Sequence, residues 1–412
     1  EVKVVDNTAS GRPTYALIKD IDDPASEEIL ELVDSTRQAG AFNILDGVLR
    51  GNALIAQADP ELIPPPLTIF WSQNNNESVI SRLSGGRFKT TFFELATNTA
   101  YILGDRNTDS DEFDDSVILH EYAHMLAVRF SHDDSMGGPH NIGDPLDPRV
   151  AWSEGWANFF SSAVRGTSIY LDSKGPGIPT TRFDIEDNVP PIDRPGYRSE
   201  ASVAGLLWDL VDETADKDDL LELPFSAVWN AFTDLRNTRF VYLPYFLDSF
   251  LARNPGLSDA LRTMVAARTI PFQPEGRPSV TEPFPEPITV GIGGAIRGAQ
   301  VDSFTSRRWN LALSSHLYTF TTAAGGAATI SLNIEGLGPA NNAGANDLDL
   351  YLYDGNGRPL EKSARPFNGQ SELITGIRLN PGTYYVEVKS YFMRANTMFF
   401  NSGKYSLTVQ IQ

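Results

Sequence analysis

Two patterns of hydrophobic and polar residues divide the chain. Up to about residue 270, segments that alternate like β-strands are mixed with longer segments whose apolar residues recur at helical spacing. The strand-like segments are VKVVDN (2–7), PTYALIKD (13–20), LTIFWSQ (67–73) and TTFFELATNTAYIL (90–103). The helix-like segments cover residues 26–51, 117–130, 151–164, 200–213 and 224–236, and others continue to about 269. A β-rich first part followed by helices predicts an α+β domain.

After residue 287 almost every segment alternates with a period of two. The predicted strands are residues 316–323, 328–335, 347–354, 372–379, 382–391 and 404–411, with Gly, Asn and Pro between them, and DGNG at 354–357 predicts a hairpin turn. This pattern indicates an all-β sandwich. The proline-rich stretch PFQPEGRPSVTEPFPEP at 271–287 separates the two parts and predicts an extended linker. We therefore expect domains at 1–270 and 288–412.

Composition and charge narrow the range of possible functions and partners of the chain. The chain has 412 residues, of which 41% are hydrophobic and 21% charged, so it can form large cores. A formal net charge of −20 argues against nucleic acid and anionic membranes as partners, since both are polyanions. We expect no membrane span, because no run of 18 apolar residues occurs. The chain has no cysteine, which excludes disulfides and thiolate chemistry.

The histidines are few and unevenly placed. Only five occur in the chain, yet His120 and His124 lie four apart in HEYAH. Positions i and i+4 share one face of a helix, so both rings can bind one metal ion. Glu121 lies beside that site, where it can take a proton from an activated water. The pattern predicts a zinc site, and a chance match is the alternative.

A catalytic zinc needs a third protein ligand and one open position. Glu154, in AWSEGWANFF at 151–160, is a carboxylate on an apolar helical segment, and an unpaired buried charge is costly. We predict that Glu154 is the third ligand, a solvated helix acid being the alternative. Asn158, one turn later, could accept a hydrogen bond from the second ring nitrogen of His120 or His124.

These residues resemble the glutamate-zincin metallopeptidases, and within them the fungalysin and thermolysin types. The resemblance rests on DDSVILHEYAHM, Gly137-Gly138-Pro139 and SEGWANF. The resemblance implies a thermolysin-like fold with a β-rich N-terminal part and a helical C-terminal part. It also implies a zinc-dependent enzyme that cleaves protein or peptide substrates, with Glu121 as the general base. In that fold the strand before the zinc helix binds peptide, and 90–103 is the candidate. Trp152 and Trp156 flank Glu154 in the sequence. We expect these two side chains either to pack in the core or to line the cleft.

The sequence also departs from the fungalysin pattern. Met125 stands where fungalysins have glycine, and a neutral Asn158 replaces their acid. Tyr197 falls at the place of their oxyanion-stabilising histidine, and His140 is the rival donor. No GAMEN-like stretch, which zinc aminopeptidases use for the substrate's amino terminus, occurs in the chain. Its absence favours an endopeptidase.

An acidic segment precedes the zinc motif. Asp105, Asn107, Asp109 and Asp111 follow the spacing of a calcium loop, but Ser110 and Ser116 replace its glycine and closing glutamate. A full EF-hand is therefore not expected, and the alternatives are a looser Ca²⁺ site or a solvated acidic loop.

The part after 288 resembles the bacterial pre-peptidase C-terminal domain, through NDLDLYLYDGNG, NPGTYYVEVKSY and GKYSLTVQI. Such domains accompany secreted bacterial proteases, which predicts a secreted and bacterial protein, with the cell surface as an alternative location. Asp347, Asp349 and Asp354 could bind calcium or act as turn and strand caps. A chain that starts at Glu1 predicts a mature form that has lost a signal, with an inhibitory pro-segment as a further candidate for removal; a sequence merely cut at this residue is the alternative.

Three functions compete. The first is a secreted zinc endopeptidase. The second is a specialised protease for glycosylated or cell-surface proteins, delivered by the β-domain. The third is a non-catalytic adhesion or carbohydrate-binding protein on the same fold, which the intact Glu121 disfavours.

Overall fold

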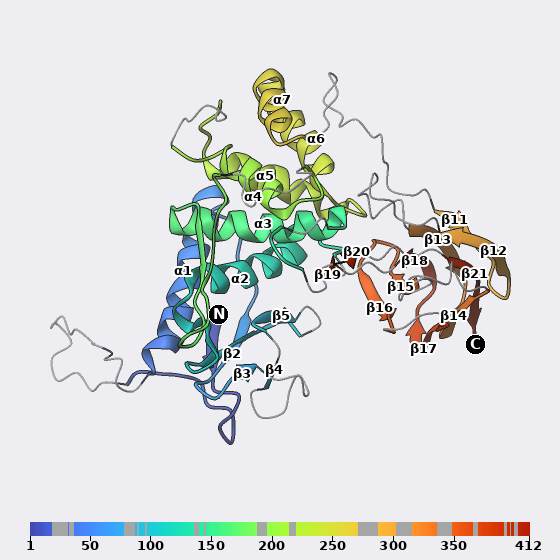
Figure 1. Cartoon of the computed structure of the whole chain (residues 1–412), viewed down its shortest axis with the longest axis horizontal. Coiled ribbons are helices and arrows are strands. Elements are labelled where there is room, and N and C mark those ends of the chain that lie inside the picture. Colours follow the sequence, from blue (N-terminus) through green and yellow to red (C-terminus); the bar gives the residue numbers. More distant parts are fainter. Residues whose placement is uncertain are drawn as a thin grey trace.

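The structure is a computed structural model of the chain (Figure 1). It describes residues 1–18, 32, 37–77, 87–88, 90–94, 97–135, 140–143, 146–187, 196–213, 220–270, 287–301, 315–335, 348–365, 370–390, 394–395, 397–398 and 403–412. Three features named above lie outside these residues: Gly137-Gly138-Pro139, residues 271–286 of the predicted linker, and Asp347.

The first part of the chain builds a small mixed sheet. Its strands are β1 (Val2–Val5), β2 (Leu67–Trp71), β6 (Thr99–Ile102) and β5 (Phe92–Glu94), in the order β1-β2-β6-β5. The first three are parallel, and β5 pairs antiparallel with β6 as the edge strand. The segment 90–103 is therefore two strands rather than one. Of the strand predicted at 13–20, the described residues contribute only a bridge between Thr14 and Val5.

Shorter elements and helices complete this part. The short strands are β3 (Asn76–Glu77), β4 (Arg87–Phe88), β7 (Gly104–Asp105), β8 (Asp109–Ser110), β9 (Ile169–Asp172) and β10 (Thr181–Asp184). The α-helices are α1 (Ala39–Ala58), α2 (Asp115–Phe130), α3 (Pro148–Arg165), α4 (Glu200–Trp208), α5 (Phe225–Thr233), α6 (Leu243–Arg253) and α7 (Ser258–Ala267). Figure 1 shows α1 beside α2 and α3, with α4 to α7 above α3. The predicted mixture of strands and helices is confirmed.

Helix α3 runs through the middle of the core. Its residues from Pro148 to Ser162 are all buried, as expected of a helix covered on all sides, and the polar ones among them include Ser153, Glu154 and Asn158. Trp152 and Trp156 are buried, and Trp156 stacks on Phe232 with ring centroids 3.6 Å apart. Both tryptophans therefore pack in the core. Met125 of α2 is also fully buried there, so a large side chain fills the position where fungalysins have glycine.

The second part is a β-sandwich. One sheet has the order β11-β13-β18-β15-β16 and the other β12-β21-β14-β17. The strands are β11 (Ile288–Thr289), β12 (Ala295–Val301), β13 (Ser315–Thr322), β14 (Gly326–Ile334), β15 (Leu348–Tyr353), β16 (Pro359–Ser363), β17 (Glu372–Leu379), β18 (Gly382–Ser390) and β21 (Gly403–Ile411), with the small hairpin β19 (Arg394–Ala395) and β20 (Thr397–Met398). All six predicted strands are found, and DGNG forms the turn between β15 and β16.

Each part has its own large hydrophobic core. The main cluster of the first part ends at Ile270, and the main cluster of the second begins at Val290. This separation agrees with the expected boundary at 271–287, which stays a prediction. Within the described residues, no helix combines the length and the apolar character that crossing a bilayer requires.

Candidate metal centre

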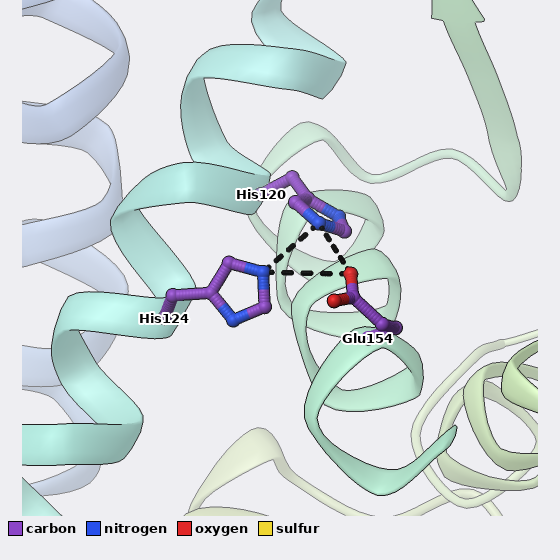
Figure 2. A group of neighbouring side chains, drawn as sticks. All are labelled: His120, His124 and Glu154. Atoms are coloured by element: carbon purple, nitrogen blue, oxygen red, sulfur yellow. Dashed lines mark hydrogen bonds and ion pairs between the residues drawn. The ribbon is translucent and has the colours of Figure 1, made fainter. Parts of the chain in front are cut away.

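Three side chains from two helices meet at one point (Figure 2). His120 and His124 lie on one face of α2, and Glu154 projects toward them from α3. The Oε2 atom of Glu154 lies 3.1 Å from Nε2 of His120 and 3.5 Å from Nε2 of His124, and the two Nε2 atoms are 3.1 Å apart. The structure thus gathers the three residues that the sequence predicted as ligands.

Local sequence explains where the two helices lie. Asp114 precedes α2, and Asp115 occupies its first turn, where the helix dipole favours acids. Helix α3 begins with Pro148 after Asp147, whose side chain accepts from the Arg149 backbone N–H as an N-cap. Gly155 then lets α3 approach α4 closely beside Glu154.

Hydrogen bonds fix the proton positions on both rings. His120 Nδ1 donates to Asn158 Oδ1 at 2.9 Å, because an amide oxygen can only accept. Ser153 Oγ donates to Asp133 Oδ2 at 2.7 Å, so at 3.2 Å it accepts from Nδ1 of His124. Both Nε2 atoms therefore face Glu154, and in a neutral ring of this tautomer each would offer its lone pair to a metal ion.

The donor set fits zinc. Ligand atoms about 2.0–2.1 Å from a tetrahedral ion lie about 3.3 Å from one another. The three distances here, 3.1, 3.1 and 3.5 Å, bracket that value. Two imidazoles and one carboxylate leave the fourth position open, as in catalytic zinc sites.

The charges at the site also favour a cation. Burial alone would lower the pKa of His124, but Glu154, Glu121 and Asp133 raise it to about 9. Burial acts to raise the pKa of Glu154, yet the two histidines hold it well below its usual value. The carboxylates therefore attract either a proton or a metal ion to this point.

Glu121 faces the same cavity without being part of the triangle. Its Oε2 accepts from the backbone N–H of Phe93 on the edge strand β5 at 2.8 Å. Burial raises its pKa, against the opposing effect of His120 and His124. A carboxylate with a raised pKa exchanges protons readily near neutral pH, as a general base must.

The site opens into a cavity of about 710 Å³. Polar walls come from the metal-site residues and from Thr90 and Thr91 before β5. Apolar walls come from β5 itself and from Tyr170, Phe183 and Ile142. Tyr170 stacks on Phe183 with centroids 4.6 Å apart. A groove with an edge strand along one wall suits an extended peptide.

The structure separates the two candidate oxyanion donors. His140 lines the cavity, with Nε2 3.7 Å from Glu154 Oε2 and 3.6 Å from Glu200 Oε2. Tyr197 is 6% exposed and packs edge-on against Tyr242, and it is not among the residues lining the cavity. His140, the less favoured sequence candidate, is thus the one brought to the site.

The predicted calcium positions are not gathered as a loop. Asp105 instead accepts from the backbone and side-chain amides of Asn107. Asp109 and Asp111 meet Asp172 of β9, and Lys174 pairs with Asp109 and Asp172. The ammonium group of Lys174 therefore already supplies a positive charge to this acidic cluster. Calcium binding by this segment stays a prediction.

The acids of the β-sandwich have local structural roles. Asp354 accepts from the backbone N–H groups of Asn356 and Arg358 and so closes the β15–β16 turn. Asp349 is buried and accepts from the Tyr351 hydroxyl at 3.1 Å. The contacts of Asp354 agree with the turn role considered from the sequence, whereas Asp349 lies inside β15 and not at a turn.

Sequence reasoning missed several residues of the site. Ser153 and Asp133 orient His124, and Glu200 lies beside His140. Ser153 directly precedes Glu154 in the quoted motif, which was a usable signal. Asp133 and Glu200 carry no spacing that would have identified them.

Comparisons with known proteins agree with this picture at the level of domains. Residues 65–239 match the family described as the Mycolysin C-terminal domain, and residues 314–390 match the bacterial pre-peptidase C-terminal domain. A protein of Archaeoglobus fulgidus, described only as uncharacterized, is 32% identical over 114 residues. That match covers 27% of this chain and 31% of the relative, so the chain spans about a third of the relative's length.

Two solved structures are similar to parts of the chain. The pre-peptidase C-terminal domain of a collagenase from Bacillus anthracis is 20% identical, with 31% of this chain and 96% of that chain covered and a TM-score of 0.21. The precursor of protealysin, a metalloproteinase from Serratia proteamaculans, is 11% identical, with 65% and 86% covered and a TM-score of 0.34.

The two family matches support a peptidase-related protein that carries a pre-peptidase C-terminal domain. For the second part this confirms the resemblance seen in the sequence. For the first part the matching family is that of mycolysin, where the sequence pointed to fungalysin and thermolysin types.

Proposed function

We propose that this protein is a secreted, zinc-dependent endopeptidase on a thermolysin-like fold, with residues 1–270 as its metallopeptidase domain. The observation that carries the proposal is the triangle of His120, His124 and Glu154 at a cavity wall, beside the half-buried carboxylate of Glu121, which lines the same cavity and is not in the triangle. The family match over 65–239 supports a protease of this general type.

A bound zinc ion supplies the charge that activates a water molecule and polarises the scissile carbonyl. Glu121 takes the proton from the attacking water and delivers it to the nitrogen of the leaving amine. The Phe93 N–H holds one oxygen of Glu121, which leaves the other for this exchange. Asn158 and Ser153 keep both histidine rings in the tautomer that leaves Nε2 free.

His140 is the best candidate to hydrogen-bond the developing oxyanion. It lines the cavity near Glu154, and Glu200 lies within reach of the same ring nitrogen. The substrate would lie along β5, whose outer edge faces no other strand among the described residues. Pairing of this kind holds a peptide through its backbone and allows many sequences.

The test combines metal content with cleavage of casein. The parent should hold about one zinc per chain, and a zinc chelator should stop cleavage until zinc is restored. Glu154→Gln should lose zinc, because a neutral amide is a weak ligand. Glu121→Gln should keep zinc but lose cleavage, because the base is gone.

The exposed Glu61 offers a matched control, since Glu61→Gln makes the same chemical change on the surface. It should leave zinc and cleavage unchanged. A parent without zinc, or a Glu121→Gln variant that still cleaves casein at the parent rate, would refute the proposed mechanism.

A further inference from the structure

A buried group of charges joins the two parts of the chain. Arg149, in the first turn of α3, donates to Glu387 of β18 at 2.8 and 3.1 Å and to the Tyr353 hydroxyl of β15 at 3.1 Å. Lys389 of β18 donates to Asp147 at 2.7 Å, and Asp147 also accepts from the Arg149 side chain at 3.2 Å. Two cations and two anions from both domains thus balance one another.

These charges are almost completely removed from water. The side chains of Arg149, Asp147 and Glu387 are exposed by 1%, 2% and 0%. Although burial opposes it, pairing with Arg149 and Lys389 lowers the pKa of Asp147 and Glu387. Without its partners from the sandwich, Arg149 would lose most of its hydrogen bonds and would have to return to water. A module held only by a linker would not bury such a group.

A second contact lies next to the first. Phe240 packs edge-on against Tyr353 and Tyr385, with ring centroids 5.9 and 5.4 Å away. Arg239 donates to the Gly355 carbonyl at 3.2 Å and to the Tyr385 hydroxyl. Figure 1 shows the sandwich beside the end at which α3 begins, in agreement with these contacts.

Both contacts continue into the metal centre. Glu154 lies five residues after Arg149 on the same helix. Asp134 accepts from the Val241 N–H at 3.2 Å, and its neighbour Asp133 holds Ser153, which orients His124. The start of α3 therefore contacts the sandwich directly, whereas the 133–134 loop is linked to it through Val241, which follows the sandwich-contacting Phe240.

We propose that the β-sandwich is a docked part of the catalytic unit, in which Glu387 and Lys389 hold the positioning residues Arg149 and Asp147 and thereby fix Glu154 relative to His120 and His124. The link to metal binding rests on the proposed function, whereas the docking does not. The sandwich is then not a module that can be removed without cost to the site.

The test compares full-length variants by calorimetry and by competition with a zinc chelator. The parent should unfold in a single transition. Glu387→Ala should split it into two transitions and weaken zinc binding about 10-fold or more, as loss of support around a metal site does.

Glu372 supplies the matched control. It is a buried carboxylate of the same sandwich, but its partners Ser363 and Arg365 lie within that domain. Glu372→Ala should lower the melting temperature of the sandwich and leave zinc affinity within about 2-fold of the parent. Equal losses of zinc affinity in the two variants would overturn the proposal.

A double-variant comparison distinguishes positioning from general damage. Arg149→Met and Glu387→Leu should together weaken zinc binding no more than the worse single variant, because each alone leaves a buried charge unpaired. Losses that simply add would overturn the pairing. If the parent binds no zinc, the proposed function fails, but calorimetry still tests the docking of the sandwich. Two unfolding transitions in the parent would overturn the docking. A single parent transition that Glu387→Ala splits into two would support it.

Discussion

Gly155 allows a direct test of how closely α3 must pack behind the metal site. A Cβ atom added there would lie 2.5 Å from Cβ of Val203 and 2.9 Å from the carbonyl oxygen of Glu200. Ordinary van der Waals contact begins at 3.4 Å, so Gly155→Ala must push α3 and α4 apart by several tenths of an ångström or more. The neighbour on one side is backbone, which cannot move like a flexible side chain.

The size of the effect follows from two opposing terms. Overpacking a core costs about 1–3 kcal/mol, and alanine in place of glycine within a helix returns about 1 kcal/mol. We expect Gly155→Ala to lower the free energy of unfolding by about 1 kcal/mol net, or roughly 2–4 °C in melting temperature. Because Glu154 is the adjacent residue, zinc affinity should fall as well.

Thermal unfolding and chelator competition on the same samples measure both effects. Gly47 of α1 is the control, since a Cβ added there would lie 3.5 Å from Cγ2 of Ile118, an ordinary contact. Gly47→Ala should therefore raise stability by about 0.5–1 kcal/mol without changing zinc affinity. If Gly155→Ala stabilised the protein as much as Gly47→Ala, the close approach of α3 and α4 would be wrong.

Two further predictions concern the cavity and the domain contact. His140→Ala should lower kcat for casein by about 10²–10³-fold with zinc retained, whereas Tyr197→Phe should leave kcat within a few-fold; the reverse order would restore Tyr197 as the donor. Asp147 and Glu387 have pKa values lowered below the usual 3.8 and 4.5, so their stabilisation is present above about pH 5 and is lost as the pH falls below about 4. Because the loss continues as the pH falls toward the lowered native pKa values, calorimetry should show one transition at pH 7 and two near pH 2, and a single transition at both would contradict this.

The features that could be predicted from the sequence are those that depend on residues close to one another along the chain. His120 and His124 share a face because of helical geometry alone, and the β-sandwich strands follow from simple alternation. Glu154 could be predicted because tryptophan, alanine and phenylalanine surround it in AWSEGWANFF, so a buried charge there required a partner. These inferences needed no knowledge of distant contacts.

What could not be predicted depends on how distant segments meet. His140 and Tyr197 both lie outside regular elements, and no periodicity says which of them enters the cavity. Asp109 and Asp111 fitted a calcium spacing, but β9 brings Asp172 and Lys174 to them instead. Of the strand expected at 13–20, the described residues 13–18 form only a bridge at Thr14, since alternation cannot show whether a partner strand is present.

The contact between Arg149 and Glu387 also bears on the order in which the protein is made. The two residues are 238 positions apart, so until the ribosome has reached β18 Arg149 has its neighbour Asp147 but not Glu387 to pair with. Contacts of such long range form late in folding. If the proposed docking holds, a chain that ends before β18 lacks Glu387 and Lys389, and the start of α3 lacks the contacts that would fix Glu154.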